Sequence, residues 1–342
     1  MEGDLVPAAG LPLDRLWLRS LRSVERDVHL VLDPLRLGLS VPQAVGLLAR
    51  RRPAAIFATG GYVAIPTVLA ARLLRIPVLL WEGNVVPGRS VRLIAPLTSA
   101  VALSYAETGP ALGRGGTPMY LTGTPIRDTR DVDREAARQH LAIPPGARLL
   151  LVFGGSQAAR RLNGAVLDAL PHLVERVHVL HVAGHEGYAE ALAARDALPE
   201  QLRARYRPYP FLRDEMLDAL AAADLVVGRA GSSTLAEAAA MGLPMVVVPY
   251  PHAGGHQRAN ARVLVAAGAA RLVEDEAFDG AALLDAATLL DQPGAHLRMS
   301  AAARSIGRPA AAAVIADMLM ALARREPLPG PAEIDRWSRG LS

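Results

Sequence analysis

Short apolar segments alternate with segments of helical periodicity along most of the chain. The apolar segments are continuous, as expected for parallel strands that are buried on both faces. We predict eight strands, at 54–58, 77–81, 100–104, 119–123, 148–153, 178–183, 224–228 and 244–249. The helical segments between them include 64–75, 159–171, 232–241 and 256–267. This order predicts an α/β protein built from parallel sheets.

A polar, charged and proline-bounded segment at 124–147 divides this pattern. A chain of 342 residues is long enough for about two domains. We therefore expect two Rossmann-like lobes, an N-terminal one at 1–126 and a C-terminal one at 127–317. The remaining tail, 318–342, is expected either to fray or to pack back on the first lobe.

The amino-acid composition limits the classes of partner and site that we expect for this protein. The 37 basic residues are all arginine, the net charge is +4, and arginine suits phosphates, so we expect anionic ligands or an anionic membrane surface. Only 4% of residues are aromatic and the arginines are scattered, so no nucleic-acid partner is expected. The absence of cysteine excludes disulfides, thiolate catalysis and cysteine zinc sites. The uncharged stretch 53–71 contains two prolines and a Gly-Gly pair, which favours strand, turn and helix over a membrane span.

Three strands end in glycine-containing turns that open helices: ATGGY (58–62), FGGSQ (153–157) and GRAGSSTLAE (228–237). Such turns can hold an anion on backbone N–H groups, but close packing is the favoured explanation of any single Gly-Gly turn. None fits the dinucleotide or Walker A pattern.

The third turn carries more polar and charged side chains than packing alone requires. Ser232, Ser233 and Thr234 open the helix, Arg229 precedes it, and Glu237 lies one turn further on. A diphosphate on the N–H groups and a ribose diol on the carboxylate would use this arrangement. The alternative is a serine cap with Glu237 facing water.

Six stretches occur in one order: FATGGYVAIP, WEGNVVPG, LTGTPIR, VFGGSQAARRLN, RAGSSTLAEAAAMGLP and HQRANA. Between about residues 52 and 275 the chain thus resembles the MurG family, which transfers N-acetylglucosamine to lipid I. The resemblance implies a two-lobed GT-B fold, UDP-N-acetylglucosamine as donor, and undecaprenyl-pyrophosphoryl-MurNAc-pentapeptide as acceptor. It also implies inversion without a metal or cofactor, at the cytoplasmic face of the cell membrane.

The resemblance also implies site residues. Arg127 would stabilise the leaving diphosphate, Phe211 and Leu212 would flank the uracil, and Gly60, Gly61 and Tyr62 would lie on the acceptor side. His256 follows the strand at 244–249 and is expected on the ligand side. The donor set is Asn84, Arg127, Gly154, Gly155, Ser156, Gln157, Phe211, Leu212, Arg229, Ser232, Ser233, Thr234, Glu237, His256 and Gln257.

Departures from the family pattern leave alternatives open. No GGTGGH-like loop with its histidine occurs at the start of the sequence, so we expect a shortened first lobe and assign Glu82 as the substitute base. A catalytically impaired UDP-sugar-binding module and a UDP-sugar epimerase are the other hypotheses. The DVD at 131–133 resembles a metal-binding motif, but acidic residues also suit a helix N-terminus, so no metal is expected. The helix at 63–75 either packs on the sheet or lies on anionic lipid.

Overall fold

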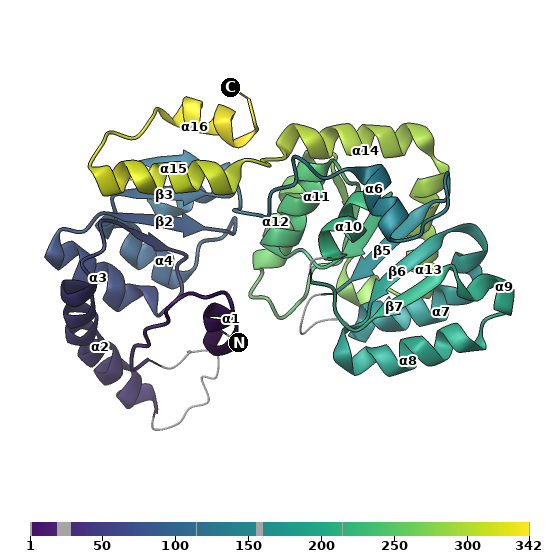
Figure 1. Cartoon of the computed structure of the whole chain (residues 1–342), viewed down its shortest axis with the longest axis horizontal. Coiled ribbons are helices and arrows are strands. Elements are labelled where there is room, and N and C mark those ends of the chain that lie inside the picture. Colours follow the sequence, from purple (N-terminus) through teal and green to yellow (C-terminus); the bar gives the residue numbers. More distant parts are fainter. Residues whose placement is uncertain (1, 19–28, 114, 155–159, 214, 342) are drawn as a thin grey trace.

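Two α/β lobes lie side by side in the computed structural model (Figure 1). The structure describes residues 2–18, 29–113, 115–154, 160–213 and 215–341. The predicted fold class, two Rossmann-like lobes with parallel sheets, is confirmed.

The N-terminal lobe is a parallel sheet in the order β1-β2-β3-β4. Its strands are β1 (Ile56–Ala58), β2 (Val78–Glu82), β3 (Ala100–Leu103) and β4 (Met119–Leu121). One face packs on the helices before and between the strands: α2 (His29–Arg51), α3 (Ala64–Leu74), α4 (Arg89–Ile94) and α5 (Gly109–Leu112). A short helix, α1 (Glu2–Ala8), lies near the N-terminus. The described residues before β1 are helix and loop.

The C-terminal lobe is a six-stranded parallel sheet in the order β10-β9-β8-β5-β6-β7. Its strands are β5 (Leu149–Phe153), β6 (His178–Val182), β7 (Tyr206–Tyr209), β8 (Leu225–Gly228), β9 (Met245–Val247) and β10 (Ala270–Leu272). Its buried strand residues are nearly all aliphatic, which explains why both faces of the sheet can be covered.

Helices cover both faces of this second sheet (Figure 1). On one face lie α6 (Arg134–His140), α10 (Glu215–Ala222), α11 (Ser232–Met241), α12 (His256–Ala266) and α14 (Pro293–Ile306). On the other lie α7 (Arg160–Arg176), α8 (Gly184–Ala197), α9 (Glu200–Arg203) and α13 (Gly280–Ala287). The segment 124–147 therefore contains both the connection between the lobes and α6, the first helix that packs on the second lobe.

The tail packs back on the first lobe and does so earlier than expected. Helix α15 (Ala311–Arg324) already places Val314 and Ile315 against Leu79 of the N-terminal sheet, and α16 (Pro331–Ser338) lies beside β4. The return occurs at 307–310 rather than near 318, because the apolar side of α15 covers the sheet face that α2 to α4 leave open. Arg308 fixes this return through its ion pair with Asp335 at 2.5 Å.

The stretch Pro293–Arg324 has the length and apolar character of a membrane span. It consists of two helices, α14 and α15, that break around residues 307–310 and pack on different lobes. Core packing accounts for its buried apolar side chains.

Candidate active site

The second sheet has a topological switch point between β5 and β8. From β5 the chain proceeds outward through β6 and β7, and it then returns to β8 and proceeds the opposite way through β9 and β10. Ligands of open parallel sheets bind at the carboxyl ends of the strands where the order reverses. The predicted turns after β5 and after β8 both lie at this point. Gly154 is buried there, whereas Gly155, Ser156 and Gln157 lie outside the described residues.

Helix α11 begins directly after β8 and has no side-chain cap. Gly231 is its N-cap, and Ser232, Ser233 and Thr234 form its first turn. Within the described part of the chain, no acceptor is paired with the N–H groups of these three residues. Free first-turn N–H groups and the positive end of the helix dipole favour an anion at this position.

The Ser232 hydroxyl is committed to a contact between the lobes. It lies 2.9 Å from the Thr124 hydroxyl, which in turn donates to Ser104 at 2.9 Å. Tyr105, at the end of β3, also hydrogen-bonds Ser232, and burial raises the pKa of this phenol well above its usual value. The backbone N–H of Ser232, not its hydroxyl, is therefore the group left for a ligand.

Glu237 lies on α11 opposite Arg127, which follows β4 in the connection between the lobes. Arg127 donates from Nε and Nη2 to the same Glu237 oxygen, Oε1. Its Nη1 donates to the Arg213 carbonyl at 3.1 Å. The Glu237 side chain is 12% exposed and does not face bulk water, contrary to the alternative that we left open.

The loop after β7 is brought to the same place by this Arg213 contact. Leu212 is buried, whereas Phe211 is 58% exposed, an unusual environment for a phenyl ring. The structure thus brings together Arg127, Glu237 and the loop at 211–213.

Glu82 ends β2 and is 4% exposed. Its Oε1 accepts hydrogen bonds from the backbone N–H of Asn84 at 2.9 Å and from the Asn84 side chain at 3.2 Å. Its Oε2 accepts from the backbone N–H of Gly88 at 3.1 Å. The carboxylate therefore closes the loop at 82–88 on itself, which explains a buried acidic residue without a catalytic role.

Helix α12 reaches across to that same loop. The Asn260 side chain accepts from the Val85 N–H at 2.9 Å and donates to Asn84 Oδ1 at 3.0 Å. His256 Nδ1 lies 3.0 Å from the Val86 carbonyl. Asn84 and His256, both predicted to contact the donor, thus hold the two lobes together in this conformation. Asn260 was missed as a functional residue, although it lies in the quoted HQRANA stretch one turn after His256.

Two predicted donor residues support the local backbone instead. The Gln257 side chain accepts from the Tyr250 N–H at 2.9 Å. Arg229 is buried, pairs with Asp275 at 2.5 Å, donates to the Val248 carbonyl and lies over the Tyr250 ring. We expected Arg229 to face the anion, but its described partners lie around β9 and Asp275 rather than at the start of α11.

Of the residues predicted to lie on the acceptor side, Gly60 and Gly61 both have left-handed backbones, with φ of 74° and 78°. A Cβ at Gly60 would lie 2.6 Å from a Val91 methyl carbon, so this position requires glycine for conformation and for space. Tyr62 is partly buried against the core of the N-terminal lobe.

The acidic DVD motif and the histidine on β6 have structural roles that explain their presence. Asp133 of the DVD motif caps α6 by accepting from two N–H groups, as its helix-start position predicted. His181 is buried on β6 between Tyr206 and Asn163, and burial lowers its pKa to about 4. Among the residues that the structure describes, no group of three or more His, Asp or Glu side chains could hold a metal ion.

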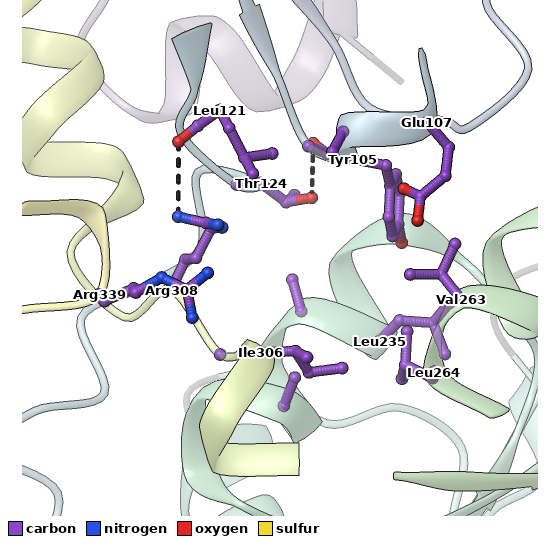
Figure 2. Close-up of a pocket in the computed structure, with 16 residues that line it drawn as sticks. Tyr105, Glu107, Leu121, Thr124, Leu235, Val263, Leu264, Ile306, Arg308 and Arg339 are labelled. Atoms are coloured by element: carbon purple, nitrogen blue, oxygen red, sulfur yellow. Dashed lines mark hydrogen bonds between the residues drawn. The ribbon is translucent and has the colours of Figure 1, made fainter. Parts of the chain in front are cut away.

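A cavity of about 270 Å³ lies between the lobes, and its lining includes Thr124 and Leu235 (Figure 2). Tyr105 and Thr124 line it from the first lobe, and Leu235 and Leu264 line it from α11 and α12. Both connections between the lobes, at Gly123 and at Gly307, also line it. This cavity therefore lies at the interface between the lobes, next to their two connections.

The chain is similar to known proteins over most of their length. Residues 149–315 match the glycosyltransferase family 28 C-terminal domain, and residues 1–103 match its N-terminal domain. The chain is 38% identical over 337 residues to the UDP-N-acetylglucosamine–N-acetylmuramyl-(pentapeptide) pyrophosphoryl-undecaprenol N-acetylglucosamine transferase of Moorella thermoacetica, covering 94% of this chain and 87% of the relative. The enzyme of the same name from Anaeromyxobacter dehalogenans is also 38% identical, with 95% and 83% coverage.

The chain belongs to the MurG family of glycosyltransferases. The predicted resemblance is therefore confirmed. The crystal structure of MurG from Acinetobacter baumannii superposes with a TM-score of 0.72 at 27% identity, covering 94% of this chain and 87% of that one. A putative UDP-N-acetylglucosamine 2-epimerase from Listeria monocytogenes gives 0.66 at 16% identity, covering 96% and 88%. At that identity the epimerase shares the fold alone, whereas the two MurG relatives are also 38% identical in sequence.

Proposed function

We propose that this chain transfers N-acetylglucosamine from UDP-N-acetylglucosamine to the C4 hydroxyl of undecaprenyl-pyrophosphoryl-MurNAc-pentapeptide, converting lipid I to lipid II. The names of the relatives support this reaction. The single observation that carries it is the start of α11 at the switch point, with free N–H groups and a recessed carboxylate at Glu237.

The donor's parts match the groups at this site. The diphosphate would lie on the N–H groups of Ser232, Ser233 and Thr234, where the helix dipole stabilises negative charge. The ribose diol would donate to Glu237, and the exposed Phe211 ring would flank the uracil. The turn at 154–157 would contact the diphosphate and the sugar. In this pose Arg127 moves from Glu237 to the diphosphate.

The reaction then needs stabilisation of the leaving group and a proton acceptor. Attack of the C4 hydroxyl on the anomeric carbon forms the new glycosidic bond, releases the hydroxyl proton to water and breaks the bond to the diphosphate. Negative charge therefore develops on the diphosphate, where Arg127 and the α11 amides would lie. We assign Glu82 as a positioning residue that shapes the loop at 82–88, in place of the catalytic base that we expected. Its three hydrogen bonds occupy both carboxylate oxygens.

The acceptor is lipid-linked, so we propose peripheral binding to the cytoplasmic face of the cell membrane through the N-terminal lobe. Helix α3 and its flanks expose Val63, Leu73 and Leu74, and α4 exposes Leu93. Arg72 and Arg92 accompany them on the same helices. Exposed apolar side chains with arginines beside them suit an anionic lipid surface. Gly60, Gly61 and Tyr62 would then lie toward the acceptor.

The test is transfer to a soluble lipid I analogue, with the disaccharide product and released UDP measured together. Product formation by the wild-type chain, and its loss in Glu237→Ala, would support the proposal. Calorimetric binding of UDP-N-acetylglucosamine without transfer would support the binding-module hypothesis instead. Appearance of the C2 epimer of the donor sugar would support an epimerase.

A further inference from the structure

The cavity of about 270 Å³ between the two lobes is lined by none of the residues that we assign to the donor. We call it the interlobe cavity. Pockets for small molecules are usually apolar, carry a few polar groups and often lie between domains. An apolar cavity of about 150 Å³ is already enough to bind benzene. Most of the walls here are apolar and are formed by Leu121, Leu235, Ala239, Val263, Leu264 and Ile306.

Close packing at both connections between the lobes bounds the interlobe cavity. A Cβ atom at Gly123 would lie 2.7 Å from the Arg308 Cβ atom. A Cβ atom at Gly307 would lie 2.6 Å from the carbonyl oxygen of Ala239, which is part of α11. Each connection is therefore already in tight contact with another wall of the cavity. These contacts keep the walls in place, so the space between them is a fixed feature of this arrangement of the lobes.

One side of the interlobe cavity carries an excess of positive charge. Arg308 and Arg339 lie together on this side, and they share a single carboxylate, that of Asp335, at 2.5 Å and 3.2 Å (Figure 2). Glu107, the acidic residue of the lining, is exposed and lies on the other side. Burial lowers the pKa of the Arg308 guanidinium below its usual value although Asp335 opposes this change, so the shared carboxylate does not fully compensate the charge.

Both arginines retain N–H donors that the protein does not use. Arg308 donates through Nη1 and Nη2, and Arg339 donates through Nε and Nη1. Within the described residues, no acceptor is paired with Arg308 Nε or with Arg339 Nη2. A carboxylate beside both groups would accept charge-assisted hydrogen bonds. Apolar walls with a cationic side therefore suit a molecule that has an apolar body and an anionic end.

We propose that the interlobe cavity binds a small carboxylic acid with an apolar body, such as a straight-chain acid of medium length. The carboxylate lies at Arg308 and Arg339, and the body packs on Leu235 and Leu264. A ligand held by both lobes stabilises this arrangement of the lobes relative to any other. The site does not depend on the proposed transfer reaction, because no donor residue contributes to it.

The binding test is calorimetric titration of the full chain with butanoate, hexanoate and octanoate. Saturating UDP is present so that the acids do not occupy the donor site. The affinity should rise about fourfold for each added methylene group until the cavity is full, as expected from the transfer of methylene groups out of water. Octanamide has the same body without the charge and should bind about tenfold more weakly than octanoate. Equal affinity for octanoate and octanamide, or no octanoate binding by the wild type, would overturn the proposal.

A variant of the apolar wall locates the body of the acid. Val263→Phe places a larger side chain in the lining of the cavity. It should weaken octanoate binding by about tenfold or more, because the ring and the ligand would occupy the same space. Val265→Phe makes the same change at an exposed position of α12 and should bind octanoate as the wild type does.

A variant of the cationic side locates the carboxylate. Arg339→Gln should weaken octanoate binding by about tenfold and leave octanamide binding unchanged. Arg336→Gln loses the same charge at an exposed position of α16 and is the matched control. Thermal melts establish that each variant is folded, and Arg339→Gln still tests the site if Val263→Phe does not fold. Wild-type affinity for octanoate in both Val263→Phe and Arg339→Gln would mean that the acid binds elsewhere and would refute the assignment.

Discussion

Arg127 donates two hydrogen bonds to a single oxygen of Glu237, at 3.3 Å from Nε and 3.2 Å from Nη2. In the described residues nothing hydrogen-bonds the other Glu237 oxygen. The pair thus joins the connection between the lobes to the helix that opens at the switch point. A ligand hydroxyl can use the second oxygen without breaking the pair, whereas a diphosphate competes with Glu237 for Arg127.

Glu237→Ala should weaken UDP binding by about 1 to 3 kcal/mol, because it removes a charged acceptor from the ribose diol. Isothermal titration with UDP measures this loss. Glu237→Gln keeps one acceptor oxygen and should lose less. Equal affinities in all three proteins would contradict the ribose assignment.

Arg127→Ala should lower kcat more than it lowers the thermal midpoint. The Arg127 side chain is 44% exposed, so its pair with Glu237 contributes little to folding. Its charge becomes important when the diphosphate leaves, because negative charge then increases beside it. Steady-state kinetics and a thermal melt on the same preparation test this. A variant that melts early but turns over normally when folded would make Arg127 structural.

Asp275→Ala should destabilise the fold by about 3 to 5 kcal/mol, because it removes the carboxylate that pairs with the buried Arg229 guanidinium and with Arg161. Urea unfolding measures the change. Arg258→Gln is the control, since it breaks an exposed pair with Glu274. UDP affinity of the folded Asp275→Ala protein should remain near wild type. A large loss of UDP affinity with normal stability would instead indicate that Arg229 contacts the donor.

The sequence predicted the strands well where they are apolar runs. All eight predicted strands are present, including β1 and β4, the partly buried edges of the first sheet. The strands that it missed, β7 and β10, are the two edges of the second sheet. Strand β7 reads YRPY and contains Pro208, which an edge strand tolerates because one side of its backbone is unpaired. Strand β10 has only three residues.

The site was predictable at the helix start but not in its long-range contacts. The serine-rich start of α11 and Glu237 follow from local spacing, since a helix places them on adjacent turns. The partner of Arg229 is 46 residues away, and that of Asn84 is 176 residues away. No local pattern reveals whether such a polar side chain faces a ligand or another lobe.

The variant Glu82→Gln distinguishes two roles for Glu82, that of a catalytic base and that of a residue that positions the loop at 82–88. The amide that replaces one oxygen would point N–H groups at the N–H of Asn84 or Gly88, so we expect a loss of about 1 to 3 kcal/mol in stability. The pH dependence of kcat should keep its shape, because no titrating group in the reaction is removed. Loss of a general base would instead reduce kcat by roughly 10²- to 10⁴-fold and remove the acidic limb of the profile.

His181 should make the fold sensitive to acid. Its side chain is buried between Tyr206 at 2.8 Å and Asn163 at 2.9 Å, and burial lowers its pKa to about 4. An unfolded histidine has a pKa of about 6.5, so below that pH the unfolded chain binds a proton that the folded chain excludes. The stability that His181 contributes is therefore complete above about pH 6.5 and is lost as the pH falls toward 4.

At pH 5 this loss should reach about 2 kcal/mol, from 1.36 kcal/mol for each pH unit below 6.5. Urea unfolding at pH 7.5 and pH 5 measures it in the wild type and in His181→Gln, which cannot titrate at this position. The difference between the two pH values should shrink by about 2 kcal/mol in the variant. His172→Gln, at an exposed position of α7, should keep the wild-type difference. If the His181→Gln variant also keeps the wild-type difference in unfolding free energy, protonation of the buried imidazole is not what destabilises the fold in acid. Its removal would then have left the difference in bound protons between the folded and unfolded chains unchanged.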